Sequence, residues 1–325
     1  MRRMNVDTNS VLESLLQEEI QYFYKYIRNY DESRRIDTII ADNMYERILE
    51  YDMCDTQKAA VINTGIELNN SNGTVIFAPS REKTTLVVLS KLVLPQKDLD
   101  EVHGTVLHEL THAHDFYDFA DFLQIRDYNE VFNSSYYHAF FFWTEFHARR
   151  IGYKRFIEYK FRKSWKQFKK HRYEFLEGIK ANFLVHSTKG RLYDLMQTMG
   201  RYYAFTELCS SYTGNFEEDI LQENVKLDMI SIINDIYIFL ANNTEFEVFK
   251  ENIVVFDELL KKLESMLTEW YNLIGIQQGC LSVYPGLFLT KIRQDVYFFV
   301  LNCRELSLNY WNILTITMAF SHVMV

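Results

Sequence analysis

The periodicity of apolar positions changes twice along the chain. Residues 11–30 carry leucine, isoleucine and phenylalanine three or four positions apart, which predicts a helix with Ser10 as its N-cap. A second helix is expected over residues 38–49. After the strand-like region described next, the helical period returns and dominates the chain beyond residue 181. The low content of glycine and proline, 11 and 3 residues, suits long helices. The apolar residues 313–325 are expected to pack as a final helix or strand.

Strand character is confined to a short region of the first half. Residues 59–68, 74–78 and 84–94 are rich in valine, isoleucine, threonine and leucine. The sequence Asn-Ser-Asn-Gly at 70–73 is a hairpin signal between the first two of these segments. The pattern therefore predicts an α+β protein that is mostly helical, in which a small antiparallel sheet of about three strands precedes a helical second half.

A candidate metal site lies in the helix expected after the third strand. Asp98 or Asp100 can cap this helix, which contains the pattern H-E-x-x-H. Residues four apart lie one above the other on a helix, so His108 and His112 can present two imidazoles to one ion. Glu109 would lie beside that ion, where its carboxylate can take a proton from a water molecule held there.

A separate helix supplies the favoured third ligand. An aromatic-rich helix is expected from about Ser135, with Glu145 on the same face as Ala148 and Gly152. Because alanine and glycine are small, another helix can approach closely at this face. Glu145 is therefore a candidate carboxylate ligand for the ion held by the two histidines.

Asp118, six residues after His112, is the competing third ligand. It could reach the ion only if the chain left the helix sharply after His112, usually through a glycine. The chain has Asp115 in that position, and aromatic residues follow it. If the helix continues, Asp118 lies about 240° around its axis from His112 and is directed away from the ion. We therefore favour Glu145 over Asp118.

Composition restricts the class of protein. The formal net charge of −9 argues against general affinity for nucleic acid. The four cysteines are far apart and form no C-x-x-C pair, which favours a reducing, cytoplasmic compartment. The N-terminal sequence lacks the apolar core of a signal peptide, and no run of about 18 apolar residues occurs, so no membrane span is expected. No sequence feature indicates an oligomeric state.

Residues 154–172 form a basic segment. Nine lysines and arginines stand there against one acid, Glu158, with aromatic residues between them. The apolar residues follow helical spacing, so we expect them to enter the core and the charges to form a solvated face. The alternative is that this face binds an anionic ligand or nucleic acid.

The H-E-x-x-H pattern resembles that of the zincin metallopeptidases. The sequence E-F-H-A, which begins at Glu145, is similar to the E-x-x-A element of gluzincin-like families such as the phage-repressor-cleaving ImmA/IrrE type. The sequence H-E-L-T-H-A-H-D, which ends at Asp115, is also similar to the mitochondrial metalloproteases that process an ATP-synthase subunit. The resemblance covers roughly residues 84–152. One departure is Arg149, since thermolysin-like gluzincins place an aspartate four residues after the ligand glutamate.

The resemblance implies a zinc-dependent peptidase that hydrolyses a peptide bond in a protein or peptide substrate. His108, His112 and Glu145 would hold Zn²⁺, and Glu109 would act as the general base. The runner-up interpretation is a non-catalytic zincin-like protein that binds a partner.

Further residues would support this chemistry. Each ligand histidine should donate its other ring N–H to an acceptor, for which Asp115 is the nearest candidate. The oxyanion also needs a donor, and the candidates are His138, Tyr137, Arg149, and Tyr202 or Tyr203.

The resemblance also implies an arrangement of the chain. Residues 1–160 would form the catalytic domain, and residues 161–325 a helical domain or extension. Residues 84–94 would form the edge strand of the sheet, where an extended substrate peptide could add as a further strand.

Overall fold

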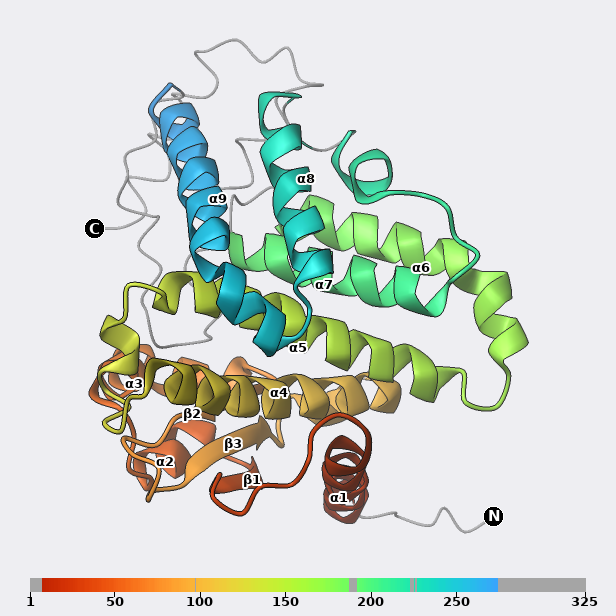
Figure 1. The fold of residues 1–325 in the computed structure, drawn as a ribbon. Helices are drawn as coiled ribbons and strands as arrows, with labels where there is room; N and C mark the ends of the chain where they lie inside the picture. The colour runs from red at the N-terminus through yellow and green to blue at the C-terminus, as the bar shows by residue number, and fades with distance from the viewer. Residues whose placement is uncertain (1–7, 97, 187–191, 223–224, 226, 274–325) are drawn as a thin grey trace, which may run out of the picture.

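The structure is a computed structural model that describes residues 8–96, 98–186, 192–222, 225 and 227–273 (Figure 1). Most of these residues are helical and three short strands form one sheet, so the expected α+β, mostly helical fold is confirmed. The first helix, α1 (Thr8–Tyr26), already includes Ser10, which is therefore not its N-cap. The C-terminal segment 313–325 lies outside the described residues.

The sheet is mixed, not antiparallel as the sequence pattern predicted. Its order is β1 (Ile36–Ala41), β3 (Thr85–Ser90) and β2 (Gly73–Ile76). The strand β3 pairs in parallel with β1 and antiparallel with β2. Parallel pairing requires a long crossover, which is here supplied by the helices between β1 and β2. The central strand is therefore β3, and the expectation that residues 84–94 form an edge strand was wrong.

Residues 38–49 were expected to form one helix, but their first part belongs to β1. The β-branched residues of β1 favour an extended backbone. The helix α2 (Met44–Leu49) begins only after Asn43, whose side chain accepts a hydrogen bond from the backbone nitrogen of Glu46 at 3.2 Å. The capping residue thus separates the strand from the helix.

Residues 59–68 were expected to form a strand, but they are helical. They belong to α3 (Asp55–Thr64) and to the 3₁₀ helix η1 (Gly65–Asn70). The junction is Gly65, whose φ of +57° is accessible to glycine at little cost. Residues 70–73 lead from η1 into β2, so the predicted hairpin between two strands is absent here.

The sheet is covered on both faces. Along β3 every residue is buried, and the side chains alternate between two apolar clusters. Val87 and Leu89 belong to the cluster shared with α4 (Leu99–Leu123), whereas Leu86 and Val88 belong to the cluster shared with α2 and α3. The helix α4 therefore lies directly on one face of the sheet, as Figure 1 shows.

The helix α4 is the centre of the molecule. Asp98 caps its N-terminus by accepting a hydrogen bond from the backbone nitrogen of Asp100 at 3.4 Å, as one of the two predicted caps. It continues without interruption past Asp115 and ends at Leu123, before Gln124 in a left-handed conformation. Because α5 (Tyr137–Lys160) covers the side of α4 opposite the sheet, most of α4 is buried (Figure 1).

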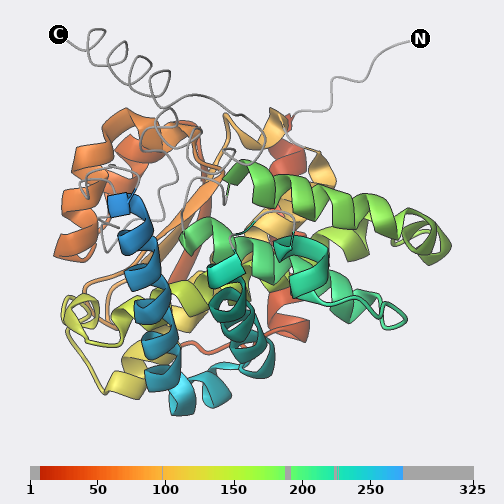
Figure 2. The same ribbon diagram turned by 90° about the horizontal axis from the view of Figure 1, so that it is seen from above.

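The second half of the chain packs onto α5. The helices are α6 (Trp165–His186), α7 (Leu192–Leu208), α8 (Leu227–Asn242) and α9 (Phe246–Leu273), with a π-helical turn at η5 (Glu217–Leu221). Of these helices, α7 and α9 pack on α5, whereas α6 packs on α7 and α8 packs on α9; Figure 2 shows them from above. Among the described residues, no helix combines the length and apolar composition needed to cross a membrane. The boundary near residue 160 stays a prediction.

Two glycines allow α4 and α5 to touch through their backbones. A Cβ atom added at Gly104 would lie 2.5 Å from the carbonyl oxygen of Gly152, and one added at Gly152 would collide with the carbonyl oxygen of Gly104. Gly152 also lies against His108, whose Cβ would be 3.1 Å from the added atom. The close approach expected from Gly152 therefore occurs, and it places α5 against the first histidine of the motif.

We expect Gly152→Ala to lower the free energy of unfolding by about 3 kcal/mol, the upper end of the usual cost of overpacking, because backbone atoms must move. Gly178→Ala, on α6, is the matched control: its Cβ would meet nothing within 4 Å, and alanine is the better helix former. Urea denaturation of both variants measures the difference. Equal stabilities would contradict the close-packing argument.

Candidate metal site

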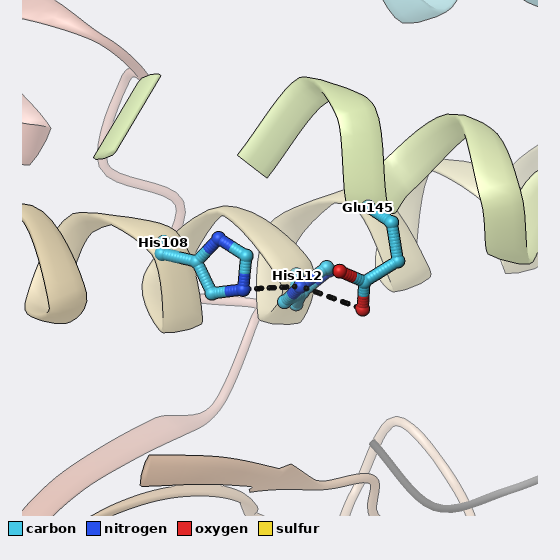
Figure 3. A group of neighbouring side chains, drawn as sticks. All are labelled: His108, His112 and Glu145. Carbon is cyan, nitrogen blue, oxygen red and sulfur yellow. Dashed lines mark hydrogen bonds and ion pairs between the residues drawn. The ribbon is translucent and has the colours of Figure 1, made fainter. Parts of the chain in front are cut away.

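Two helices bring three possible ligands together. His108 and His112 project from α4, and Glu145 reaches them from α5 (Figure 3). The two Nε2 atoms lie 3.1 Å apart, and Nε2 of His112 lies 3.4 Å from Oε1 of Glu145. All three side chains are buried, and the potential ligand atoms lie within 4.8 Å of one another.

These distances fit a tetrahedral metal ion. Two ligand atoms that each lie 2.0–2.2 Å from zinc at a tetrahedral angle are separated by about 3.3–3.6 Å, which includes the 3.4 Å between His112 and Glu145 and is slightly more than the 3.1 Å between the two Nε2 atoms. In addition, Oε1 of Glu145 is buried and has no hydrogen-bond partner within the described residues. A buried carboxylate oxygen without a partner is costly, and a cation would satisfy it. The donor set of two imidazoles and one carboxylate is one that zinc uses in catalytic sites.

The position of Glu145 is fixed from α7. Gln197 donates a hydrogen bond from Nε2 to Oε2 of Glu145 at 3.2 Å, and Tyr193, one turn earlier on α7, acts on the same carboxyl. This interaction leaves Oε1 directed at His112. Neither Gln197 nor Tyr193 was predicted, because no spacing in the sequence connects α7 to the motif.

The tautomer of His112 is fixed by a chain of hydrogen bonds. The hydroxyl of Thr144 donates to Oδ2 of Asp115 at 2.8 Å, so its oxygen can accept from Nδ1 of His112 at 3.0 Å. With the proton on Nδ1, the lone pair of Nε2 is available to an ion. The prediction that Asp115 supports a ligand histidine stays a prediction; the structure places it one hydrogen bond further away, through Thr144.

Asp115 is held ionised at the centre of this network. It accepts a hydrogen bond from Nδ1 of His147 at 2.8 Å and forms an ion pair with Arg28 at 2.9 Å. Burial alone would raise the pKa of Asp115, but His147, Arg28 and Thr144 outweigh it and lower that pKa. His147 is itself buried.

Burial keeps both motif histidines neutral. It lowers the pKa of His112 to about 3, and it lowers the pKa of His108 well below its ordinary value, with a further contribution from the charge of Arg149. Neutral imidazoles are the form that binds metal ions. Nδ1 of His108 makes no well-aligned hydrogen bond within the described residues.

Burial has the opposite effect on the two carboxyl groups. It raises the pKa of Glu145 to about 8 and that of Glu109 to about 7, while the positive charge of Arg149 acts against both shifts. A divalent cation beside these groups would favour their ionised forms. Burial thus brings the pKa of Glu109 close to neutrality, where a general base operates well.

Arg149 is the nearest of the predicted supporting residues. It lies one helical turn after Glu145, and its charge acts on the pKa values of His108, His112, Glu109 and Glu145. Its side chain is partly exposed, so a ligand can reach it.

His138, another predicted supporting residue, lies elsewhere. It is 37% exposed and faces α9, where its Nε2 lies 3.0 Å from Glu264. Its ring also stands edge-on to Phe142. The expectation that it stabilises a transition state is therefore not supported by its position.

Asp118, Tyr202 and Tyr203 are also directed away from the three ligand candidates. Asp118 pairs with Arg34 at 2.5 Å and with Arg28 at 3.1 Å, because α4 continues and turns it away. Tyr202 donates to Asp219, and Tyr203 packs against Arg150.

The basic segment 154–172 is interrupted at residues 161–164, between α5 and α6. Three of its cations pair with acids on other elements: Lys154 with Glu207, Arg155 with Glu19 and Lys160 with Asp98. The expectation that its aromatic residues enter the core holds in part: Phe161 and Phe168 are buried, Phe156 and Tyr159 are half-buried, and Trp165 is exposed. These pairings give Lys154, Arg155 and Lys160 a structural role, and the alternative of an anion-binding face stays a prediction for the rest of the segment.

Comparisons with protein-family models, with curated proteins and with solved structures found no match for this chain.

Proposed function

We propose that this protein is a zinc-dependent metallopeptidase of the zincin type. The observation that carries the proposal is the convergence of His108, His112 and a buried oxygen of Glu145 at metal-ligand distances, with Glu109 next to the first histidine. This oxygen has no hydrogen-bond partner in the part of the chain that the structure describes. A structural pair of histidines would not require a buried carboxylate whose oxygen lacks any other partner. When bound, zinc would activate a water molecule and polarise the carbonyl group of the scissile bond.

The residues of the chain would divide the remaining work. Glu109 would accept the proton of the attacking water and deliver it to the leaving amine, because its carboxylate follows the first histidine of the motif. Thr144 and Asp115 would keep His112 in the tautomer that presents the lone pair of Nε2 to the ion. Gln197 would hold Glu145 in place.

A substrate peptide could reach the site along β2. This strand is an edge of the sheet, and a Cβ added at its first residue, Gly73, would lie 3.0 Å from Cγ of Glu109. Further along, the outer edge is occupied by Gln57, which bonds the carbonyl of Val75 at 3.0 Å and the nitrogen of Phe77 at 2.6 Å. An extended peptide would therefore pair beside Gly73, next to the general base.

We expect the wild-type protein to contain about one zinc per chain and His108→Ala/His112→Ala to contain none. Protein purified without a histidine tag would be measured by elemental analysis, with His171→Ala as a control at an exposed histidine. Both proteins would then be incubated with a library of unstructured peptides, and new termini identified by mass spectrometry. Cleavage by the wild type should stop on chelation and return with zinc.

Two results would contradict the proposal. Equal zinc contents in the wild type and the double variant would show that His108 and His112 do not bind the metal. Stoichiometric zinc without any cleavage would favour the non-catalytic, partner-binding alternative.

We place the protein in the cytoplasm, a proposal supported by two buried cysteines, Cys54 and Cys209, that form no disulfide within the described residues.

A further inference from the structure

Two arginines lie beside the candidate metal site on neighbouring helices. Arg149 is on α5, one turn after Glu145, and Arg201 is on α7, one turn after Gln197. The helices touch at this point, since a Cβ added at Gly200 would lie 3.0 Å from Cβ of Arg149. Both side chains are partly exposed. The pair therefore forms a positively charged edge of the site.

Neither arginine forms a salt bridge with an acid within the described residues, although the charge of Asp194 acts on Arg201 and the charge of Arg149 acts on Glu109 and Glu145. No salt bridge or side-chain hydrogen bond joins Arg149 or Arg201 to another described residue, and Nε of Arg149 is buried without a partner. Other arginines on the same helices differ. Arg150 pairs with Glu207, and Arg155 pairs with the buried Glu19. Among the arginines of α5 and α7, Arg149 and Arg201 are therefore the two that form no salt bridge within the described residues.

Two partly buried cations destabilise each other unless an anion lies between them. Burial, together with the charge of Arg149, lowers the pKa of Arg201 to about 10, so the two guanidinium groups are electrostatically coupled. Such an arrangement has a cost in folding that a bound anion removes. Arginine is well suited to bind a carboxylate, because its planar guanidinium group donates two parallel hydrogen bonds to the two carboxylate oxygens.

We propose that Arg149 and Arg201 form a subsite for a carboxylate group of the substrate. One helical turn separates Arg149 from Glu145, about 6 Å along the axis, and an extended peptide advances about 3.3–3.6 Å per residue. The carboxylate therefore lies within about two residues of the scissile bond. It belongs to an aspartate or glutamate side chain or to the C-terminus of the substrate. As a substrate preference, this assignment rests on the proposed peptidase function.

The test measures binding to the metal-free protein, so that it does not depend on catalysis. Three blocked peptides are titrated by calorimetry: acetyl-Ala-Glu-Ala-amide, its glutamine counterpart, and acetyl-Ala-Ala-Ala with a free C-terminus. We expect one or both carboxylate peptides to bind roughly 10- to 100-fold more tightly than the glutamine peptide, the range for hydrogen bonds to a charged group. Whichever carboxylate peptide binds identifies the source of the carboxylate.

Variants assign the preference to the two arginines. Arg149→Gln and Arg201→Gln keep most of the side-chain packing. Each should reduce the ratio of the affinities for the carboxylate peptide and the glutamine peptide to less than about threefold. Arg150→Gln is the matched control on α5 and should leave it unchanged. Equal binding of all three peptides by the wild type, or discrimination that survives both substitutions, would overturn the subsite.

A cleavage profile separates this inference from the proposed function. If the zinc-loaded wild type cleaves library peptides without enrichment of an acidic group near the scissile bond, the subsite is wrong and the peptidase proposal stands. If the protein cleaves nothing but the metal-free protein still selects the carboxylate through Arg149 and Arg201, the peptidase proposal is wrong and the anion site stands.

Discussion

Glu109→Gln is expected to keep its zinc and to lose about 10²- to 10⁴-fold in the rate of peptide cleavage. The amide can still donate or accept a hydrogen bond, but it cannot take a proton from water, and proton transfer by a positioned base contributes this much. Glu109 is not one of the three converging ligand candidates, so elemental analysis should find wild-type zinc in the variant. Initial rates on a peptide identified from the library measure the loss.

The size of the effect depends on the environment of Glu109. Its carboxyl is buried and its pKa is raised to about 7, so substitution removes a base that is tuned for neutral pH. Glu101→Gln, at an exposed position in the first turn of the same helix, is the control and should retain wild-type activity. If the Glu109→Gln variant cleaves at the wild-type rate, another group accepts the proton.

The residues of the site that could be predicted are those whose relation is local. The i, i+4 spacing on one helix is sufficient to place His108 and His112 together. Glu145 followed from a weaker argument, that small residues on its helix permit close approach. The structure brings that helix against α4 at Gly104 and Gly152, and it places Glu145 3.4 Å from His112. Whether these residues bind zinc stays a prediction.

The supporting residues could not be predicted, because each depends on contacts between distant elements. Gln197 and Arg201 come from α7, more than fifty residues after Glu145, and Arg28 comes from the segment after α1. Thr144 precedes Glu145, but its role depends on the hydroxyl lying between His112 and Asp115. A helical wheel gives the direction of a side chain and does not identify its partner across a helix interface.

The errors in the sheet have a similar cause. Valine and isoleucine are compatible with strands and with buried helices, so the composition of residues 59–68 alone does not distinguish a strand from a helix. The parallel pairing of β1 with β3 depends on the helical crossover between them, which was not expected. The same pairing makes β3 central and leaves β2, whose first residue adjoins Glu109, at an edge of the sheet.

Glu145→Ala is expected to weaken zinc binding by more than roughly 100-fold, whereas Asp118→Ala should change it by less than about 10-fold. Changes to residues that only support a ligand already cost about 10- to 100-fold, so the loss of a ligand should exceed that range. Asp118 forms ion pairs with Arg34 and Arg28 and is directed away from the ligand candidates. Competition with a chromogenic chelator gives both dissociation constants.

The comparison must separate lost coordination from lost folding. Glu145→Ala leaves the amide of Gln197 without its partner, and Asp118→Ala leaves two arginines without one, so both metal-free variants are destabilised for reasons unrelated to zinc. Glu145→Gln keeps the shape of the side chain and removes only its charge, and it should still bind zinc much more weakly than the wild type. Thermal unfolding of each metal-free variant, with and without added zinc, then isolates the metal contribution. If Asp118→Ala loses the zinc-induced rise in Tm and both Glu145 variants keep it, the third ligand is Asp118, and α4 must open after His112 to deliver it.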